Sequence, residues 1–297
     1  MPLRRRPLAP KARPSRWNRP LVALSVVCTV IVVIYAVAHL GGEPDRPRAP
    51  APTTSLDRAR HWARDATSFT VIGDSLAVSL QDEFTAAAAP YGIPVSGRAI
   101  GACGVLRGTQ AQERLEPVSW TATCDATVQP ILDEIGSGAP TLVLWLSSWD
   151  SSNRIVDGEP LRFGSKRDDP VFRRLIGDAV DQLSRGGSHV VFLTVPHRTT
   201  RPDLTGTFGG VPYVVEPESA LERRSIDHLN QMLRRYVATH AHRTALVDLD
   251  TIVCRHRRPC PFTTAGVALR PVDGRHFAGP GPSWVSQRIL SRLGLDP

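Results

Sequence analysis

Short apolar runs alternate with amphipathic segments from about residue 69 to residue 293. The short, β-type apolar runs start at residues 69, 93, 141, 189 and 245. Between and after them, segments with helical periodicity or many helix-forming residues cover residues 76–89, 124–137, 172–183, 218–240 and about 284–293. Such β-α alternation predicts a parallel sheet with helices on both faces. We therefore expect a three-layer α/β/α sandwich with a five-stranded parallel sheet and flavodoxin-like strand order.

A different apolar run, residues 21–40, contains no Asp, Glu, Lys or Arg. About 20 apolar residues cross a hydrocarbon core of ~30 Å as a helix, so this segment is predicted to be a transmembrane helix. A cleaved signal peptide is the alternative, because Ala36-Val37-Ala38 offers small residues for a signal peptidase. However, the apolar run is longer than the apolar h-region of a usual signal peptide. The basic residues 1–20 are predicted to be a cytoplasmic tail, which puts the rest of the chain outside a cell membrane crossed once.

After the apolar run, residues 41–65 begin with a Pro- and Gly-rich stretch typical of a linker, and residues 66–297 form the predicted extracytoplasmic domain. The chain of 297 residues is 41% hydrophobic and 22% charged, which suits one sizeable domain with appendages. Its net charge is +8, of which the first twenty residues contribute +7, leaving +1 for the remainder. The charge therefore does not indicate a nucleic-acid partner.

Four of the five cysteines lie in the predicted exported domain, where an even number favours disulfides. We expect Cys103 to pair with Cys124 and Cys254 to pair with Cys260. Zinc binding around Cys254, His256 and Cys260 is the alternative, but a second pair of ligands is missing from that spacing. No phosphate-binding or dinucleotide-binding glycine pattern is present to indicate a cofactor, and no metal is expected.

The chemistry is concentrated where the first apolar run stops, at Gly73-Asp74-Ser75. Ser75 could simply cap the following helix, as serine and aspartate often do. However, Asp273 and His276 stand three residues apart near the other end of the chain. A serine hydroxyl becomes a good nucleophile when an imidazole takes its proton and a carboxylate orients that imidazole. Ser75, His276 and Asp273 supply these three parts.

These two motifs resemble the catalytic motifs of the SGNH (GDSL-type) hydrolase family, over residues 66–297. The resemblance is closest to extracytoplasmic SGNH domains that accompany membrane acyltransferases of cell-envelope glycans, because Gly101-Ala102-Cys103-Gly104 and Trp149-Asp150 also resemble patterns found there. It implies that Ser75, Asp273 and His276 are catalytic. It also implies an oxyanion hole made by the backbone amides of Ser75 and of Gly101 or Gly104.

The family pattern usually has Gly-x-Asn-Asp where this chain has Ser147-Ser148-Trp149-Asp150, so Trp149 stands in place of the asparagine. The missing asparagine would donate to the oxyanion, so either the backbone amides suffice or the Trp149 indole N–H replaces it. Trp149 could instead be a packing residue or a wall for sugar stacking.

Several other residues near predicted strand ends are candidate substrate contacts. They are Asp74, Trp149, Asp150 and His197, although a histidine in a loop such as His197 is often only a surface residue. Residues 151–170 have few apolar anchors and are predicted to be a surface excursion that shapes the substrate cleft.

The expected reaction is acyl transfer through an acyl-serine intermediate. Water as the acceptor would make an esterase, and a sugar hydroxyl would make an O-acyltransferase. The resemblance favours O-acyl esters, above all acetyl esters, of a cell-envelope glycan, with a membrane acyltransferase as partner. A catalytically silent glycan-binding or scaffolding module is the alternative prompted by the missing asparagine. An α/β-hydrolase is disfavoured because Ala77 breaks the Gly-x-Ser-x-Gly pattern.

Overall fold

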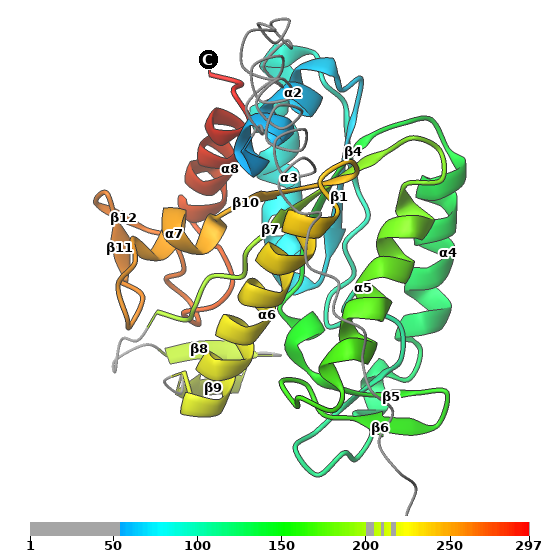
Figure 1. The fold of residues 1–297 in the computed structure, drawn as a ribbon. Helices are drawn as coiled ribbons and strands as arrows, with labels where there is room; N and C mark the ends of the chain where they lie inside the picture. The colour runs from blue at the N-terminus through cyan, green and yellow to red at the C-terminus, as the bar shows by residue number, and fades with distance from the viewer. Residues whose placement is uncertain (1–53, 200–204, 209–210, 215–217, 297) are drawn as a thin grey trace, which may run out of the picture. The chain divides into compact units, whose positions relative to one another are not determined.

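A five-stranded parallel sheet lies at the centre of the domain in the computed structural model (Figure 1), which describes residues 54–199, 205–208, 211–214 and 218–296. Every neighbouring pair of strands in this sheet is parallel. Across the sheet the order is β2 (Val95–Gly97), β1 (Phe69–Gly73), β4 (Leu142–Leu146), β7 (His189–Leu193) and β10 (Thr244–Val247). Taken in chain order this is second, first, third, fourth, fifth, which confirms the flavodoxin-like prediction.

Helices cover both faces of the sheet. On one face α3 (Ser75–Ala88) packs against α8 (Gly281–Arg292), and the other face carries α4 (Cys124–Ser137), α5 (Asp169–Leu183) and α6 (Ala220–Thr239) (Figure 1). All residues of the two central strands β1 and β4 are buried, as expected for a parallel sheet covered on both sides. The three predicted layers are therefore present.

The first helix of the described part, α2 (Ser55–Asp65), occupies a region that we assigned to the linker. Its N-cap is Thr54, whose hydroxyl accepts from the Asp57 amide while the Asp57 carboxylate bonds back to Thr54. The helix packs against β10, and the Ser55 hydroxyl accepts from the Leu246 amide. The linker predicted over residues 41–65 therefore ends before residue 55.

Residues 151–170 are also more ordered than predicted. They contain β5 (Asn153–Val156) and β6 (Glu159–Leu161), which form a three-stranded antiparallel sheet with β3 (Thr109–Ala111). The surface excursion is thus a small second sheet with a buried side. Smaller elements complete the domain: α7 (Leu249–Cys254), the hairpin of β8 (Thr205–Phe208) with β9 (Val211–Val214), and the pair β11 (Thr263–Thr264) with β12 (Val267–Ala268).

Both predicted disulfides are confirmed, Cys103 with Cys124 and Cys254 with Cys260. The second one occupies the sulfurs that the zinc alternative would have required. The predicted transmembrane segment 21–40 and the basic tail 1–20 lie outside the described residues. Among the helices that the structure describes, none has the length and apolar character needed to cross a membrane.

Candidate active site

Ser75 is the first residue of α3, directly after the turn that ends β1. Gly73 makes this turn with φ = 141°, and a Cβ atom there would lie 1.7 Å from the carbonyl oxygen of Leu146 on the neighbouring strand. Only glycine fits such a close approach. The sharp turn places Ser75 at the carboxyl end of β1, at the edge of the sheet where parallel sheets bind ligands.

Asp74 connects the two central strands instead of facing a substrate. Its Oδ1 accepts from the Leu76 amide at 2.8 Å, and its Oδ2 accepts from the Ser148 hydroxyl at 2.8 Å and the Trp149 amide at 2.7 Å. The side chain is fully buried, and burial raises the pKa of its carboxyl although these hydrogen bonds oppose the shift. The expected substrate contact by Asp74 is therefore wrong, because its oxygens are occupied by protein donors.

Ser75, His276 and Asp273 form a continuous hydrogen-bonded series. His276 Nε2 lies 2.7 Å from Ser75 Oγ, although the two residues are 201 positions apart in the chain. His276 Nδ1 lies 2.5 Å from Asp273 Oδ2, and Asp273 Oδ1 accepts from the backbone amides of Arg275 and His276 at 2.9 and 2.8 Å. The predicted meeting of the two distant motifs is present in the structure.

The charge of Asp273 fixes the imidazole tautomer. Burial alone would raise the pKa of Asp273, but the hydrogen bond from the His276 ring and the bonds from the two backbone amides lower it to about 2. Asp273 is consequently a carboxylate at neutral pH and can only accept at His276 Nδ1. The proton of a neutral imidazole then resides on Nδ1, which leaves the Nε2 lone pair directed at the Ser75 hydroxyl.

A buried ion pair between Asp150 and Arg154 holds the loops beside Ser75. The Arg154 guanidinium donates to Asp150 Oδ1 at 3.0 Å, and Asp150 also accepts from the Leu106 amide at 3.0 Å and from the Trp145 indole at 2.9 Å. Arg154 donates further to the carbonyl oxygens of Leu106, Gly108 and Trp149. Asp150 is thus a buried structural residue, and the expected substrate contact is wrong.

The two candidate oxyanion glycines differ in their surroundings. A Cβ on Gly104 would lie 2.5 Å from both Arg154 Nη2 and Asp150 Oδ1, so the buried ion pair requires glycine there. Gly101 is exposed, and a Cβ there would have no neighbour within 4 Å. Packing therefore explains the glycine at 104 but not the one at 101. Their oxyanion roles stay predictions.

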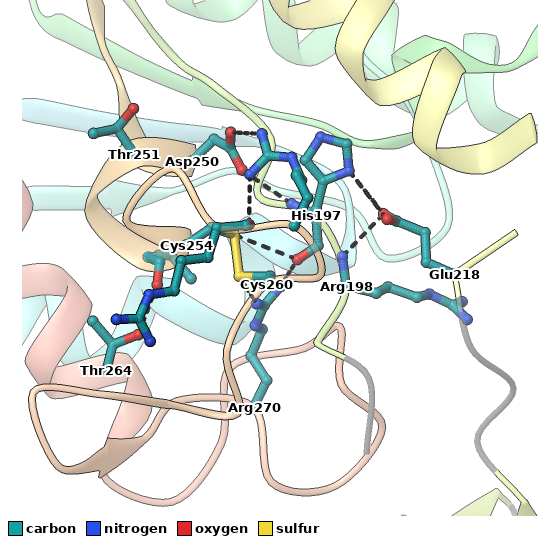
Figure 2. Close-up of a disulfide and its surroundings, with 12 residues drawn as sticks. His197, Arg198, Glu218, Asp250, Thr251, Cys254, Cys260, Thr264 and Arg270 are labelled. Atoms are coloured by element: carbon teal, nitrogen blue, oxygen red, sulfur yellow. Dashed lines mark hydrogen bonds and ion pairs between the residues drawn. A yellow bond between two sulfur atoms is a disulfide. The ribbon is translucent and has the colours of Figure 1, made fainter. Parts of the chain in front are cut away.

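His197 is fully buried and is held between two carboxylates. Its Nδ1 lies 3.0 Å from Glu218 Oε1, as Figure 2 shows, and its Nε2 lies 3.0 Å from Asp227 Oδ1. Carboxylate oxygens only accept, so both ring nitrogens donate and the ring is an imidazolium. Burial lowers the pKa of His197, but its bond and charge interaction with Glu218 outweigh burial and raise the pKa overall. The expected substrate contact by His197 is therefore wrong, because both of its ring nitrogens are occupied by protein carboxylates.

His197 is joined to the loop that carries Asp273 and His276 (Figure 2). Its carbonyl oxygen accepts from Arg270 Nη1 at 2.5 Å, and the other terminal nitrogen of Arg270 lies 2.8 Å from the sulfur of Cys260. Arg270 is buried, which lowers its pKa to about 10 and still leaves it charged at neutral pH. Two residues after His197, the Thr199 amide donates to the Gly274 carbonyl at 2.9 Å.

A cleft of about 340 Å³ lies between the small second sheet and the first turns of α6, and it reaches Arg275, the residue before His276. Its lining includes Trp149, Asn153, Glu222, Ser225 and Arg275, and Arg275 forms an ion pair with Glu222. Trp149 packs edge-to-face against Trp120, with ring centroids 5.2 Å apart and an interplanar angle of 85°. Trp120 is 58% exposed, so the two indoles extend the cleft wall towards solvent.

Three solved structures that are similar to this chain are distant from it in sequence. The periplasmic domain of a lipopolysaccharide acetyltransferase from Salmonella ser. Paratyphi A is 15% identical, with 77% of this chain and 82% of that one covered and a TM-score of 0.45. The C-terminal catalytic domain of peptidoglycan O-acetyltransferase A from Streptococcus pneumoniae is 14% identical (77% and 93% covered, TM-score 0.43). Phospholipase A1 from Streptomyces albidoflavus is 15% identical (78% and 100%, TM-score 0.42).

The comparison by sequence is more specific. No curated protein matches the chain significantly. The family profile described as "SGNH domain (fused to AT3 domains)" matches residues 43–291, which is most of the chain and includes every residue of the hydrogen-bonded series. The chain therefore belongs to the family of SGNH domains that are found fused to AT3 domains.

Proposed function

We propose that this protein is a serine esterase or O-acyltransferase that works through an acyl-serine intermediate. As a member of its family, the domain is an SGNH-type ester hydrolase or acyltransferase. The observation that carries the proposal is the hydrogen-bonded series from Asp273 through His276 to Ser75. It provides a nucleophile, a base within reach of the nucleophile's proton and a carboxylate that orients the base.

In the first half of the reaction, Ser75 Oγ attacks the ester carbonyl carbon while His276 Nε2 takes the hydroxyl proton. The carbonyl electrons move to the oxygen, and Asp273 stabilises the imidazolium. When the tetrahedral intermediate collapses, the alcohol leaves with the proton from His276, and the acyl group remains on Ser75. In the second half, water or a sugar hydroxyl gives its proton to His276 and attacks the acyl-serine, which releases an acid or a new ester and restores Ser75.

The developing oxyanion needs hydrogen-bond donors. The amide of Ser75 lies at the first position of α3 and has no acceptor within the helix, so it is one donor. The amide of Gly101 or Gly104 is the second, as the family resemblance implies. At the position of the missing asparagine the Trp149 amide is already bonded to Asp74. Trp149 therefore could contribute only its indole N–H.

A glycan is the proposed substrate or acceptor. The cleft lining combines hydroxyl groups, the Asn153 amide, the Glu222–Arg275 ion pair and the exposed Glu113 carboxylate, which suits the many hydroxyl groups of an uncharged sugar better than an acidic ligand. The indoles of Trp149 and Trp120 offer flat apolar surface on which a sugar ring can stack. We further propose that the predicted helix 21–40 anchors the chain in a cell membrane. An AT3 acyltransferase, the type of domain to which this family is fused, is the proposed partner.

A fluorophosphonate probe tests the serine assignment. We expect covalent labelling of the full-length protein and of a Ser137→Ala control, in which a serine at the end of α4 is changed, but no labelling of Ser75→Ala. Incubation with acetylated and unacetylated glycans, followed by mass measurement, then separates hydrolysis from transfer. Absence of labelling at every pH from about 6 to 9 would favour the silent binding or scaffolding module instead.

A further inference from the structure

A second large pocket, with a volume of about 570 Å³, lies among α2, α7 and α8, outside the proposed catalytic machinery. Its lining is strongly basic. The charged or titratable residues that line it are Arg60, Arg255, His256, Arg288, Arg292 and Asp296. Four arginines thus face a single carboxylate. The first twenty residues account for +7 of the chain's net charge of +8, so this concentration is a local feature of a nearly neutral remainder.

In the part of the chain that the structure describes, most of these arginines have no carboxylate partner. Within the described part of the chain, no ion pair involves Arg255, Arg288 or Arg292, whereas Arg60 lies 3.6 Å from Asp57. The surplus of positive charge remains available to an anion from outside the chain.

The pocket is held in shape by its surroundings. Arg255 ends α7 in the left-handed conformation, with φ = 51°, inside the turn closed by the disulfide of Cys254 with Cys260. Arg60 Nε donates to the carbonyl oxygen of Arg292 at 3.1 Å, which joins α2 to the end of α8. The Arg288 guanidinium lies over the Trp284 ring, 5.2 Å from its centroid. These contacts restrict where the charges can lie before any ligand binds.

Apolar groups lie beside the arginines in the same pocket, namely Ile252, Ala265 and Trp284. A tryptophan next to arginines is the pairing that proteins place at the boundary between lipid headgroups and acyl chains. A free inorganic anion would use only the charges, whereas a phospholipid would also use the apolar groups. The composition of the pocket therefore favours a lipid.

The chain also restricts how far this pocket can be from a membrane. Residues 41–54 connect the proposed anchor to α2, and 14 fully extended residues span at most about 50 Å. Arg60 lies in the second turn of that helix. No residue that lines this pocket also lines the cleft, so occupation of the pocket would leave the cleft open.

We infer that the basic pocket of Arg60, Arg255, Arg288 and Arg292 is a docking site for the headgroups of anionic phospholipids, which holds the domain against the membrane surface. This inference rests on the membrane anchoring in the proposed function. It does not depend on the identity of the substrate or on catalysis by Ser75.

The test uses the full-length protein in nanodiscs, with hydrogen exchange measured for peptides that cover residues 250–258 and 284–293. We expect slower exchange of both peptides in discs containing phosphatidylglycerol than in discs of phosphatidylcholine alone. The triple variant Arg255→Gln/Arg288→Gln/Arg292→Gln should lose this protection. Each basic residue near an anionic leaflet contributes roughly fivefold to association, so the docking equilibrium constant should fall about a hundredfold. The matched control Arg173→Gln/Arg174→Gln/Arg235→Gln removes the same charge from α5 and α6 and should keep the protection.

Several outcomes would overturn the inference. Equal exchange in the two kinds of disc would refute docking. If the control variant lost as much protection as the triple variant, the effect would depend on net charge alone and not on this pocket. Protection by soluble glycerol 3-phosphate in phosphatidylcholine discs, to the level reached with phosphatidylglycerol, would assign the pocket to small phosphate esters. A chain that enters neither disc would refute the anchor and this inference together, while fluorophosphonate labelling of Ser75 would still decide the enzymatic proposal separately.

Discussion

The imidazolium of His197 allows a quantitative test of what holds the loop of Asp273 and His276 in place. We consider the substitution His197→Gln, which keeps a side chain of similar size with one amide donor group but cannot carry a charge. In the variant, Glu218 remains buried without its main cationic partner. Among the described residues, its other donors are the Arg198 amide at 3.1 Å and the partly exposed Arg223 at 3.4 Å. His197 itself is fully buried, so water cannot replace the lost contact without opening the structure.

The expected loss of stability follows from the burial of each partner. Removing one member of a buried ion pair costs about 3–5 kcal/mol, because the other charge is left uncompensated. The two remaining donors to Glu218 place this case at the lower end. The contact with Asp227, whose side chain is 57% exposed, adds at most about 1 kcal/mol. We therefore expect the free energy of unfolding to fall by about 3 kcal/mol at pH 6.

The same contact predicts a pH dependence with a definite sign. The pKa of His197 is raised above its ordinary 6.5, so its stabilising contribution is complete below pH 6.5 and is lost as pH rises through the higher folded-state pKa. For Glu218, burial would raise the pKa, but the contact with His197 lowers it below its ordinary 4.5. Its contribution is present above pH 4.5 and is lost as pH falls through the lower value. The difference in stability between wild type and variant should thus be greatest between pH 4.5 and 6.5.

Urea unfolding followed by tryptophan fluorescence, repeated from about pH 5 to pH 9, measures this difference. His61→Gln is the matched control, because His61 is also near a carboxylate but its side chain is 65% exposed, and it should change stability little at any pH. If His197→Gln is as stable as wild type at pH 6, or if the gap between them widens as pH rises, the assignment of an imidazolium is wrong. Nitrogen chemical shifts of the His197 ring would give an independent reading of its protonation.

Three further predictions concern the residues around Ser75. Asp273→Asn should lower kcat towards a small aryl ester about 10⁴-fold with little change in thermal stability, because it favours the wrong His276 tautomer; a loss below tenfold would contradict the orienting role. Arg154→Met should cost about 3–5 kcal/mol in urea unfolding because it leaves Asp150 charged and buried, and the double variant Arg154→Met/Asp150→Asn should recover part of that loss. Gly73→Ala should lower stability by at least about 2 kcal/mol, since its Cβ would overlap the Leu146 carbonyl, and a fully stable variant would refute the described turn.

Local patterns in the sequence were sufficient for the strands, for Ser75 and for the pairing with His276. Each depends on a signal that lies within a few residues, such as an apolar run that stops at Gly73 or an aspartate three residues before a histidine. A parallel sheet then brings the carboxyl ends of its strands to one edge, which is why motifs 201 residues apart could be expected to meet. The disulfides followed in the same way from the number and spacing of cysteines.

The buried charged residues could not be recognised in this way. Arg154 and Asp150 stand four residues apart, a spacing that usually marks an exposed pair. The carbonyls of Leu106 and Gly108, 48 and 46 positions away, show that the arginine is enclosed. His197 likewise depends on Glu218 and Asp227, which lie 21 and 30 positions away. Burial and partners at such separations are set by tertiary packing, so a polar residue after a strand looks the same whether it faces a substrate or the core.

These buried residues bear on the departure from the family pattern at Trp149. Its amide donates to Asp74 and its carbonyl accepts from Arg154, so the backbone at this position is fixed on both sides by fully buried groups. Asp74 is in turn the residue before Ser75, and Arg154 also holds the carbonyl of Leu106 in the loop that follows Gly104. The loop geometry around Ser75, the proposed nucleophile, is therefore maintained by contacts that do not involve the side chain of residue 149. Tryptophan in place of asparagine at this position removes one hydrogen-bond donor and adds an aromatic wall. The backbone amides around Ser75 are still held in position by the buried charges of Asp74 and Arg154.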